Sequence, residues 1–416
     1  MTAEPSLVHY VRIRRTEDLP FLAAGMCDEL LLNANQLENS PERTSAHLRT
    51  TGYRYMVDPM LWRFQVPAWW QNERGELKRN YRRLAAHYGE GTRVPLGEGP
   101  ALETVTERSD WERIAANVVH YQRQRLNLPC QLDLLDGSLA SELKPSRILA
   151  PALVPDSEAV DRVNAVLVEA AAAAAGEPVV ATVIIPKARL NPGGVEAILR
   201  SVPRFGVCGY FVWAPGATED WVVATPDALP ALVAAVRDLA TGGVPVIQVQ
   251  LGYTAAALST IGMAGICHHL GWIDSGESPQ QSRARRRSRR TYVPGVRHAM
   301  GFPDAGACGR PLEPKAYSAL YCECRFCTGM LERGAHPLQL LVEEELEPSG
   351  AALVPTGQAI AANTFHYLSS RQLEVQAFAA GTGTQVIARD IERASALAGH
   401  VNAQRLERLA EGLMAA

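Results

Sequence analysis

Short apolar runs rich in β-branched residues recur along the chain. They are continuous, not alternating, which is typical of strands buried on both faces of a parallel sheet. Helical patterns precede the last four runs, for example "SEAVDRVNAVLVEAAAAA" before the fifth and "LPALVAAVRDLA" before the seventh. This alternation predicts an α/β fold, a (β/α)8 TIM barrel. The eight runs cover residues 8–13, 29–34, 53–60, 147–154, 179–186, 208–215, 244–252 and 265–272.

A doubly wound open sheet is the structural alternative. No G-x-G-x-x-G follows an early strand, which argues against a dinucleotide-binding sheet. Between the third and fourth strands an insertion at about 61–145 includes the basic and aromatic stretch "RFQVPAWWQNERGELKRNYRRLAAHYGEGTR". It either lies over the C-terminal face of the barrel, where active sites are built, or forms a peripheral helical subdomain with a solvated basic face.

Composition narrows the class of protein. The chain has 416 residues, 47% of them apolar, and a formal net charge of -3, which fits one barrel with additions. No apolar run reaches the roughly 18 to 20 residues of a membrane span, and no signal peptide is visible. We therefore expect a cytoplasmic protein with no membrane partner. Eight cysteines are too few for a disulfide scaffold.

Three of these cysteines, Cys322, Cys324 and Cys327, lie together in "YCECRFCTGM". Such short spacings let three thiolates converge on one ion at about 2.3 Å. Tetrahedral zinc needs a fourth ligand, and the candidates are His336, His366 and, less well placed, Cys308. A redox C-x-x-C normally accompanies a thioredoxin-like βαβ pattern, which is missing. The spacing favours structural zinc, with another metal cluster or unligated thiols as alternatives.

The C-x-C-x-x-C segment, followed by a histidine in "ANTFHYLSSRQLEVQAF", resembles the zinc motif of the tRNA-guanine transglycosylase superfamily. The resemblance implies that Cys322, Cys324, Cys327 and His366 bind Zn²⁺. It also implies a (β/α)8 barrel with a late zinc-binding subdomain. The expected units are a barrel over 1–275 with the inserted segment at about 61–145, a basic loop over 276–312, and a zinc-binding subdomain with closing helices over 313–416.

Members of this superfamily exchange a guanine in nucleic acid for a 7-deazaguanine base. They act on tRNA, as the queuine- and archaeosine-type enzymes do, or on DNA, as the DpdA-like enzymes do. The resemblance implies a transglycosylase whose partners are nucleic acid and a 7-deazaguanine base, with a homodimer or accessory modification proteins as further possibilities. Departures from the motifs of the tRNA enzymes favour DNA.

The chemistry needs a carboxylate nucleophile at the sugar C1′, a second acid/base group and a slot for a planar purine. The resemblance places the first aspartate at the end of the third strand, where this chain reads "MVDPMLWRFQ". Asp58 is therefore the candidate nucleophile and Gln65 a candidate binding residue. A carboxylate at the C-terminal end of a barrel strand is well placed for catalysis, although Asp58 could also simply cap a turn before Pro59.

The family's second aspartate is missing from the eighth strand, which reads "GICHHLGWIDSGE". Asp274 follows just past this strand and could reach the site from the loop. Alternatively His268 or His269 supplies the acid/base function, or the pair is a hydrogen-bonded core feature. Because side chains alternate along a strand, only one of the two histidines faces the barrel axis.

The segments expected to recognise the base also depart from the family. The fifth strand continues into "VIIPKARLNPGG", which places Lys187 where an amide and glycines are expected. The sixth strand, with "GYFVWAPGA", supplies Gly209 and Trp213. The indole of Trp213 either stacks on a base or belongs to the core.

A run of arginines follows the eighth strand. Arginine forks suit phosphate oxygens, and the alternative is a solvated charge run. The candidate phosphate ligands are Arg283, Arg285, Arg286, Arg287, Arg289 and Arg290.

Two rival functions stay open: a non-catalytic, zinc-containing nucleic-acid-binding relative, and a glycosyl-transfer enzyme acting on small 7-deazapurine nucleotides.

Overall fold

The structure is a computed structural model of the 416-residue chain. It describes residues 7–22, 25–72, 74–93, 96, 107–127, 142–270, 290–342, 346–349 and 352–415.

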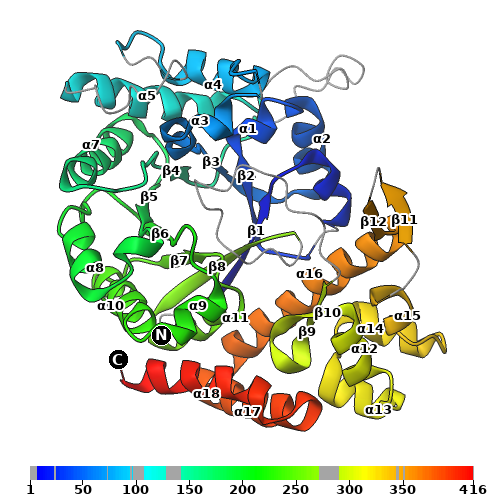
Figure 1. The fold of residues 1–416 in the computed structure, drawn as a ribbon. Coiled ribbons are helices and arrows are strands. Elements are labelled where there is room, and N and C mark those ends of the chain that lie inside the picture. Colours follow the sequence, from blue (N-terminus) through cyan, green and yellow to red (C-terminus); the bar gives the residue numbers. More distant parts are fainter. Residues whose placement is uncertain are drawn as a thin grey trace.

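Eight parallel strands of the described chain form a nearly closed barrel (Figure 1). Their order around the wall is β3-β2-β1-β8-β7-β6-β5-β4. The seam lies between β3 and β4, where the Ser146 amide donates to the Tyr55 carbonyl at 2.8 Å. The predicted fold class is confirmed. The strands are β1 (Val8–Ile13), β2 (Glu29–Asn33), β3 (Arg54–Asp58), β4 (Ile148–Leu149), β5 (Val179–Ile184), β6 (Gly209–Trp213), β7 (Val246–Val249) and β8 (Met263–His269).

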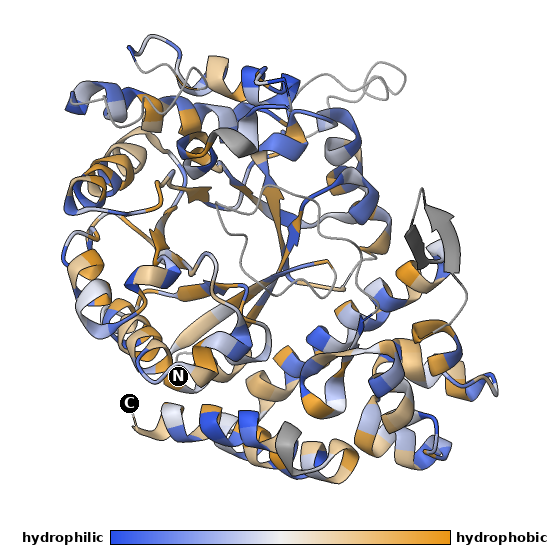
Figure 2. Cartoon of the chain, in the orientation of Figure 1, coloured by the Kyte–Doolittle hydropathy of each residue, from blue (hydrophilic) through white to orange (hydrophobic). Residues whose placement is uncertain are grey.

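The barrel wall separates two apolar cores. Side chains that point inward, such as Tyr10, Met56 and Cys267, form the smaller core. Their strand neighbours point outward into the larger core beneath the helices. This double burial explains why the strands read as continuous apolar runs. Figure 2 shows apolar residues concentrated in the strands and on the helix faces that cover them.

Helices after the strands form the outer ring. Side-chain caps begin three of them: Ser157 accepts from the Val160 amide, Asn191 from the Gly194 amide at 3.0 Å, and Thr218 from the Trp221 amide at 3.2 Å. Such caps satisfy backbone donors that a helix leaves unpaired at its start. The helices are α1 (Ala34–Leu37), α2 (Pro41–Thr51), α7 (Glu158–Ala174), α8 (Pro192–Leu199), α9 (Glu219–Ala224), α10 (Ala228–Ala240) and α11 (Gly252–Ala257).

The insertion after β3 begins at the C-terminal face and then turns to the side. The turn η2 (Leu61–Gln65) and α3 (Pro67–Trp70) follow β3 directly. They lead into α4 (Arg79–Tyr88), and α5 (Arg108–Gln124) packs against α7. The Tyr88 hydroxyl donates to the Pro59 carbonyl at 3.1 Å, which holds α4 beside the end of β3. Both placements considered from the sequence therefore occur, in succession.

The C-terminal module starts earlier than predicted. Residues 290–309 do not form a loop: β9 and β10 pair as an antiparallel hairpin and α12 follows. The prediction of a loop over 276–312 is wrong for this part, and residues 271–289 lie outside the described chain. The module comprises β9 (Arg290–Val293), β10 (His298–Gly301), α12 (Phe302–Gly309), α13 (Pro314–Ala316), η7 (Tyr317–Tyr321), α14 (Arg325–Glu332), α15 (Leu338–Leu341), β11 (Leu346–Ser349), β12 (Ala352–Pro355), α16 (Gly357–Ala380), α17 (Gly383–Ala398) and α18 (His400–Ala415).

A buried ionic network fastens this module to the barrel. Arg297 pairs with Glu374 at 2.9 Å and with Asp390 at 2.8 Å. The hydroxyl of Tyr253 on α11 donates to Asp390 at 2.6 Å. Burial acts to raise the pKa of Glu374, but Arg371 and Arg297 outweigh it, so this pKa lies below its ordinary value. Among the described helices, none combines the length and the apolar character that a membrane span requires.

Candidate functional site

The predicted cysteine cluster forms a compact group with one histidine. The ligand atoms of Cys322, Cys324, Cys327 and His366 all lie within 4.8 Å of one another, and all four residues are buried. His366 Nδ1 lies 3.9, 3.3 and 3.4 Å from the three Sγ atoms in chain order. A tetrahedral ion bound to three sulfurs and one nitrogen needs its ligand atoms roughly 3.5 to 3.8 Å apart. The group can therefore hold a metal ion.

The surrounding structure orients these ligands. Cys324 is the N-cap of α14, Cys327 lies in its first turn, and His366 comes from α16. The other imidazole nitrogen of His366, Nε2, donates to the carbonyl of Tyr292 at 2.8 Å. This hydrogen bond leaves Nδ1 as the ligand atom, as a metal-binding histidine requires.

The cluster also favours a thiolate. Burial acts to raise the pKa of the Cys324 thiol, but hydrogen bonds from Cys322 and Cys327 and the charge of His366 outweigh it. The pKa of Cys324 therefore lies well below its ordinary value. The other proposed ligands lie elsewhere. His336 accepts from the Leu338 amide at 3.3 Å, and neither His336 nor Cys308 belongs to the cluster.

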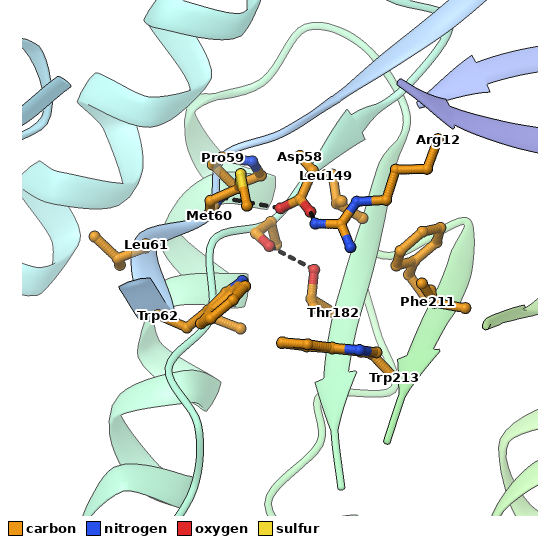
Figure 3. A pocket seen from close by; sticks show the side chains of 13 residues that line it. Arg12, Asp58, Pro59, Met60, Leu61, Trp62, Leu149, Thr182, Phe211 and Trp213 are labelled. Carbon is orange, nitrogen blue, oxygen red and sulfur yellow. Dashed lines mark hydrogen bonds and ion pairs between the residues drawn. The ribbon is translucent and has the colours of Figure 1, made fainter. Parts of the chain in front are cut away.

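A second site lies at the C-terminal mouth of the barrel. A cavity of about 340 Å³, including its opening to solvent, lies beside the ends of the strands. Figure 3 shows Arg12 reaching Asp58 on one side of this cavity, with Trp62 and Trp213 on the other. The lining residues are Arg12, Asp58, Pro59, Met60, Leu61, Trp62, Leu149, Ala150, Ala152, Thr182, Phe211, Trp213 and Val249.

Asp58 occupies the predicted position at the end of β3. One carboxylate oxygen accepts from the Met60 amide at 3.0 Å, and the other forms an ion pair with Arg12. Met60 has a left-handed backbone with φ 54°, so the chain turns sharply after Pro59. The carboxylate thus caps this turn and also faces the cavity, which combines the two interpretations of the sequence.

Arg12, which lines the cavity, and its hydrogen-bond partner Asn33 are candidate site residues that the sequence analysis does not predict. Arg12 is buried in β1 and donates through Nε to the Asn33 side chain at 2.8 Å. Both stand at inward positions near the C-terminal ends of apolar strands. A polar residue at such a position is the signal that could have identified them.

Only one histidine of the predicted pair faces the cavity side of the wall. His269 is in register with Arg12 of β1, and its Nε2 accepts from the Gln250 amide at 2.8 Å. The carbonyl oxygen of the same Gln250 side chain accepts from the Trp213 indole at 3.0 Å. Because an amide nitrogen only donates, this chain of hydrogen bonds makes Nε2 of His269 an acceptor.

His268 points to the opposite side, toward the C-terminal module. Its Nε2 lies 2.6 Å from Nε2 of His9, and its ring meets Tyr367 edge-on with centroids 5.2 Å apart. Burial, with smaller effects from His268 and Arg371, holds the pKa of His9 well below 6.5. His268 is therefore separated from Asp58 by the barrel wall.

The structure places three of the four predicted substrate-binding residues away from the cavity. Gln65 is bonded to the Val154 backbone through both its amide atoms, at 2.7 and 3.2 Å, and joins two loops. Lys187 is exposed, with its ammonium 4.5 Å from the centroid of the Trp221 ring. Gly209 begins β6, at the barrel end opposite to Trp213. Of the predicted site residues, Asp58 and Trp213 line the cavity, and His269 is linked to Trp213 through Gln250.

The remaining predictions fall mostly outside the described residues. Asp274 belongs to this group. Arg290 is described and is exposed at the start of β9. The others are Arg283, Arg285, Arg286, Arg287 and Arg289.

Comparisons with known proteins do not assign the chain to a family. No protein-family model and no curated protein matches the chain. Among solved structures, the chain is similar to the catalytic domain of a β-amylase from Paenibacillus polymyxa, with 10% identity and a TM-score of 0.31, over 64% of this chain and 92% of that one. It is also similar to a nitroalkane oxidase from Streptomyces ansochromogenes, with 14% identity and a TM-score of 0.29, over 98% and 96%.

Proposed function

We propose that this protein is a base-exchange enzyme that replaces guanine in nucleic acid with a 7-deazaguanine derivative of the preQ0 or preQ1 type, with DNA as the favoured substrate. The observation that carries the proposal is a Cys3His group beside a barrel whose mouth presents Asp58 in a cavity walled by aromatic rings. The resemblance seen in the sequence joins these two features in one protein family.

The ion bound by the Cys3His group is proposed to be zinc. Three thiolates and one imidazole, closed off from solvent, are the ligand set of structural zinc sites. Zinc would tie α14 to α16 and so complete the core of the C-terminal module. Since no ligand position stays open, the ion would take no part in the chemistry.

The proposed reaction proceeds in two displacements at the sugar C1′. Asp58 attacks C1′ as the bond to guanine breaks, and guanine leaves with a proton supplied by an acid. The 7-deazaguanine nitrogen then attacks C1′, loses its proton and releases Asp58. Trp62 and Trp213 offer flat walls for a purine. Arg12 holds one Asp58 oxygen, while the oxygen bound to the Met60 amide keeps a lone pair for attack.

Incorporation of labelled guanine, and of labelled 7-deazaguanine, into duplex DNA and tRNA tests the proposal. We expect exchange with the wild-type protein and none with Asp58→Asn. Mass spectrometry of nucleosides from cells with and without the gene identifies the natural product. Absence of exchange with both nucleic acids and both bases contradicts the proposal.

Two observations favour a second candidate, a non-catalytic nucleic-acid-binding relative. Asp58 is tied to a buried arginine, and β8 carries no aspartate. In that case Asp58 would have a structural role. Asp58→Asn would then leave nucleic-acid binding unchanged, and the wild-type protein would bind without exchanging any base.

A further inference from the structure

The strongest unassigned feature is a cationic surface on the insertion after β3. Residues 74–88 contain five lysines and arginines and one glutamate, a net charge of +4. Arg74, Arg79, Arg82 and Arg83 are exposed. No described acidic side chain forms an ion pair with Arg79 or Arg82.

The helix α4, which carries three of these arginines, is strongly amphipathic. Tyr81, Leu84 and Tyr88 are buried against the barrel side, while Arg79, Arg82 and Arg83 lie on the solvent side. Residues three and four apart on a helix are neighbours, and like charges at this spacing destabilise the helix. The first turn of α4 also carries no acidic residue, although the positive end of a helix dipole favours one.

The repulsion among these arginines therefore opposes the stability of α4, and within the described residues no ion pair to Arg79 or Arg82 offsets it. A bound polyanion would offset it. The arrangement also suits phosphates, because several arginine forks point outward from one face.

The position of α4 connects this surface with the mouth of the barrel. Arg83 donates to the carbonyl of Glu38, the C-cap of the short helix α1 that follows β2, at 3.1 Å. Behind the surface, the ammonium of Lys78 donates to the Trp69 carbonyl at 2.8 Å. The guanidinium of Arg63 lies 4.5 Å from the Trp69 ring centroid and 5.2 Å from that of Trp62. Trp62 lines the cavity that holds Asp58.

We propose that α4 and the turn before it bind the phosphate backbone of a nucleic acid whose target nucleotide enters the barrel mouth past Trp69 and Trp62. This inference rests on the nucleic-acid substrate of the proposed function. The surface lies on the side of the barrel away from the C-terminal module (Figure 1), so it would hold the nucleic acid independently of that module.

Salt-dependent binding to a short labelled DNA duplex and to a tRNA, measured by fluorescence anisotropy, tests the surface. In Arg79→Ala/Arg82→Ala we expect roughly tenfold weaker binding at about 50 mM salt and a salt slope shallower by about 2, because two phosphate contacts are lost. The charge-preserving variant Arg79→Lys/Arg82→Lys should keep the wild-type slope.

The matched control is Arg200→Ala/Arg237→Ala. It removes the same charge from exposed positions at the C-terminal ends of α8 and α10, at the opposite end of the barrel. This control should bind like wild type. The alanine variant of α4 should melt at or above the wild-type temperature, since it relieves repulsion.

Other outcomes separate a failure of the α4 surface from a failure of the proposed function. Equal binding by the α4 variant and the control overturns the surface and leaves the proposed function standing. Failure of wild-type protein to bind either nucleic acid overturns both. The tighter of the two wild-type complexes identifies the class of nucleic acid.

Discussion

His268 and His269 are consecutive in β8 and serve opposite faces of the barrel wall. His268 contacts His9 and Tyr367 on the outside, and His269 contacts Gln250 on the inside. Tyr367 directly follows His366 of the metal cluster. The path from the Cys3His cluster to the barrel mouth thus runs through His366, Tyr367, His268 and His269. Folding of the C-terminal module should therefore affect the position of β8, and with it the position of His269.

Metal removal should therefore unfold the module first. Cys324→Ser, or a strong chelator, should remove about one equivalent of zinc and lower the melting temperature, because structural zinc contributes folding free energy directly. Metal analysis and differential scanning calorimetry check this. Cys308→Ser is the control, since Cys308 lies outside the cluster, and it should keep both metal and stability. A metal-free protein with unchanged melting would contradict the prediction.

The ion pair between Arg12 and Asp58 should show strong coupling. Arg12→Met leaves a buried carboxylate without its partner, which typically costs about 3 to 5 kcal/mol. Adding Asp58→Asn should recover much of this loss, because the orphaned charge disappears. Urea unfolding of the two single variants and the double variant measures the coupling free energy. Additive losses would mean that the two side chains do not depend on each other.

Most of the barrel follows from the sequence because parallel strands covered on both faces are continuous apolar runs. Each of the eight strands overlaps its predicted run. The fourth is shorter than its run, since Pro151 follows Ala150 and has no amide to extend the ladder. The sequence does not predict the hairpin at 290–301, because its turn contains Pro294 and Gly295, which are loop signals in a single sequence.

The candidate site is harder to predict from the sequence, because its residues are far apart in the chain and meet only when the sheet closes. The three cysteines of the Cys3His cluster, Cys322, Cys324 and Cys327, could be found from their local spacing, and the resemblance supplied His366. Arg12 is a lone charge in an apolar strand, and nothing local to it indicates that it meets Asp58. Long-range pairing of this kind needs the register of three strands at once.

The buried histidine pair predicts a loss of stability in mild acid. The pKa of His9 is lowered in the folded state by burial, His268 and Arg371, so the unfolded chain binds more protons as the pH falls below about 6.5. Stability is therefore full above this pH and declines below it, by up to about 1.4 kcal/mol per pH unit for one such group. Urea unfolding between about pH 5.5 and 7.5 should show this slope.

His9→Gln should flatten that dependence, because glutamine keeps a polar contact with His268 but does not titrate in this range. His120→Gln on α5 is the control, since His120 is exposed. The same slope in His9→Gln and wild type would assign the acid sensitivity to other groups.

Replacing Gln250 should change the arrangement of side chains at the barrel mouth but leave the C-terminal module folded. Its side chain orders Trp213 and His269, and its own backbone has φ 67°, followed by Leu251 with φ 69°. Two successive non-glycine residues in this region cost on the order of 1 to 3 kcal/mol each and tend to occur at functional sites. Gln250→Leu should preserve zinc content and nucleic-acid binding but lower base exchange, and should shift its pH profile because Nε2 of His269 loses its donor. Full exchange with an unchanged pH profile would mean that Gln250 only fills space.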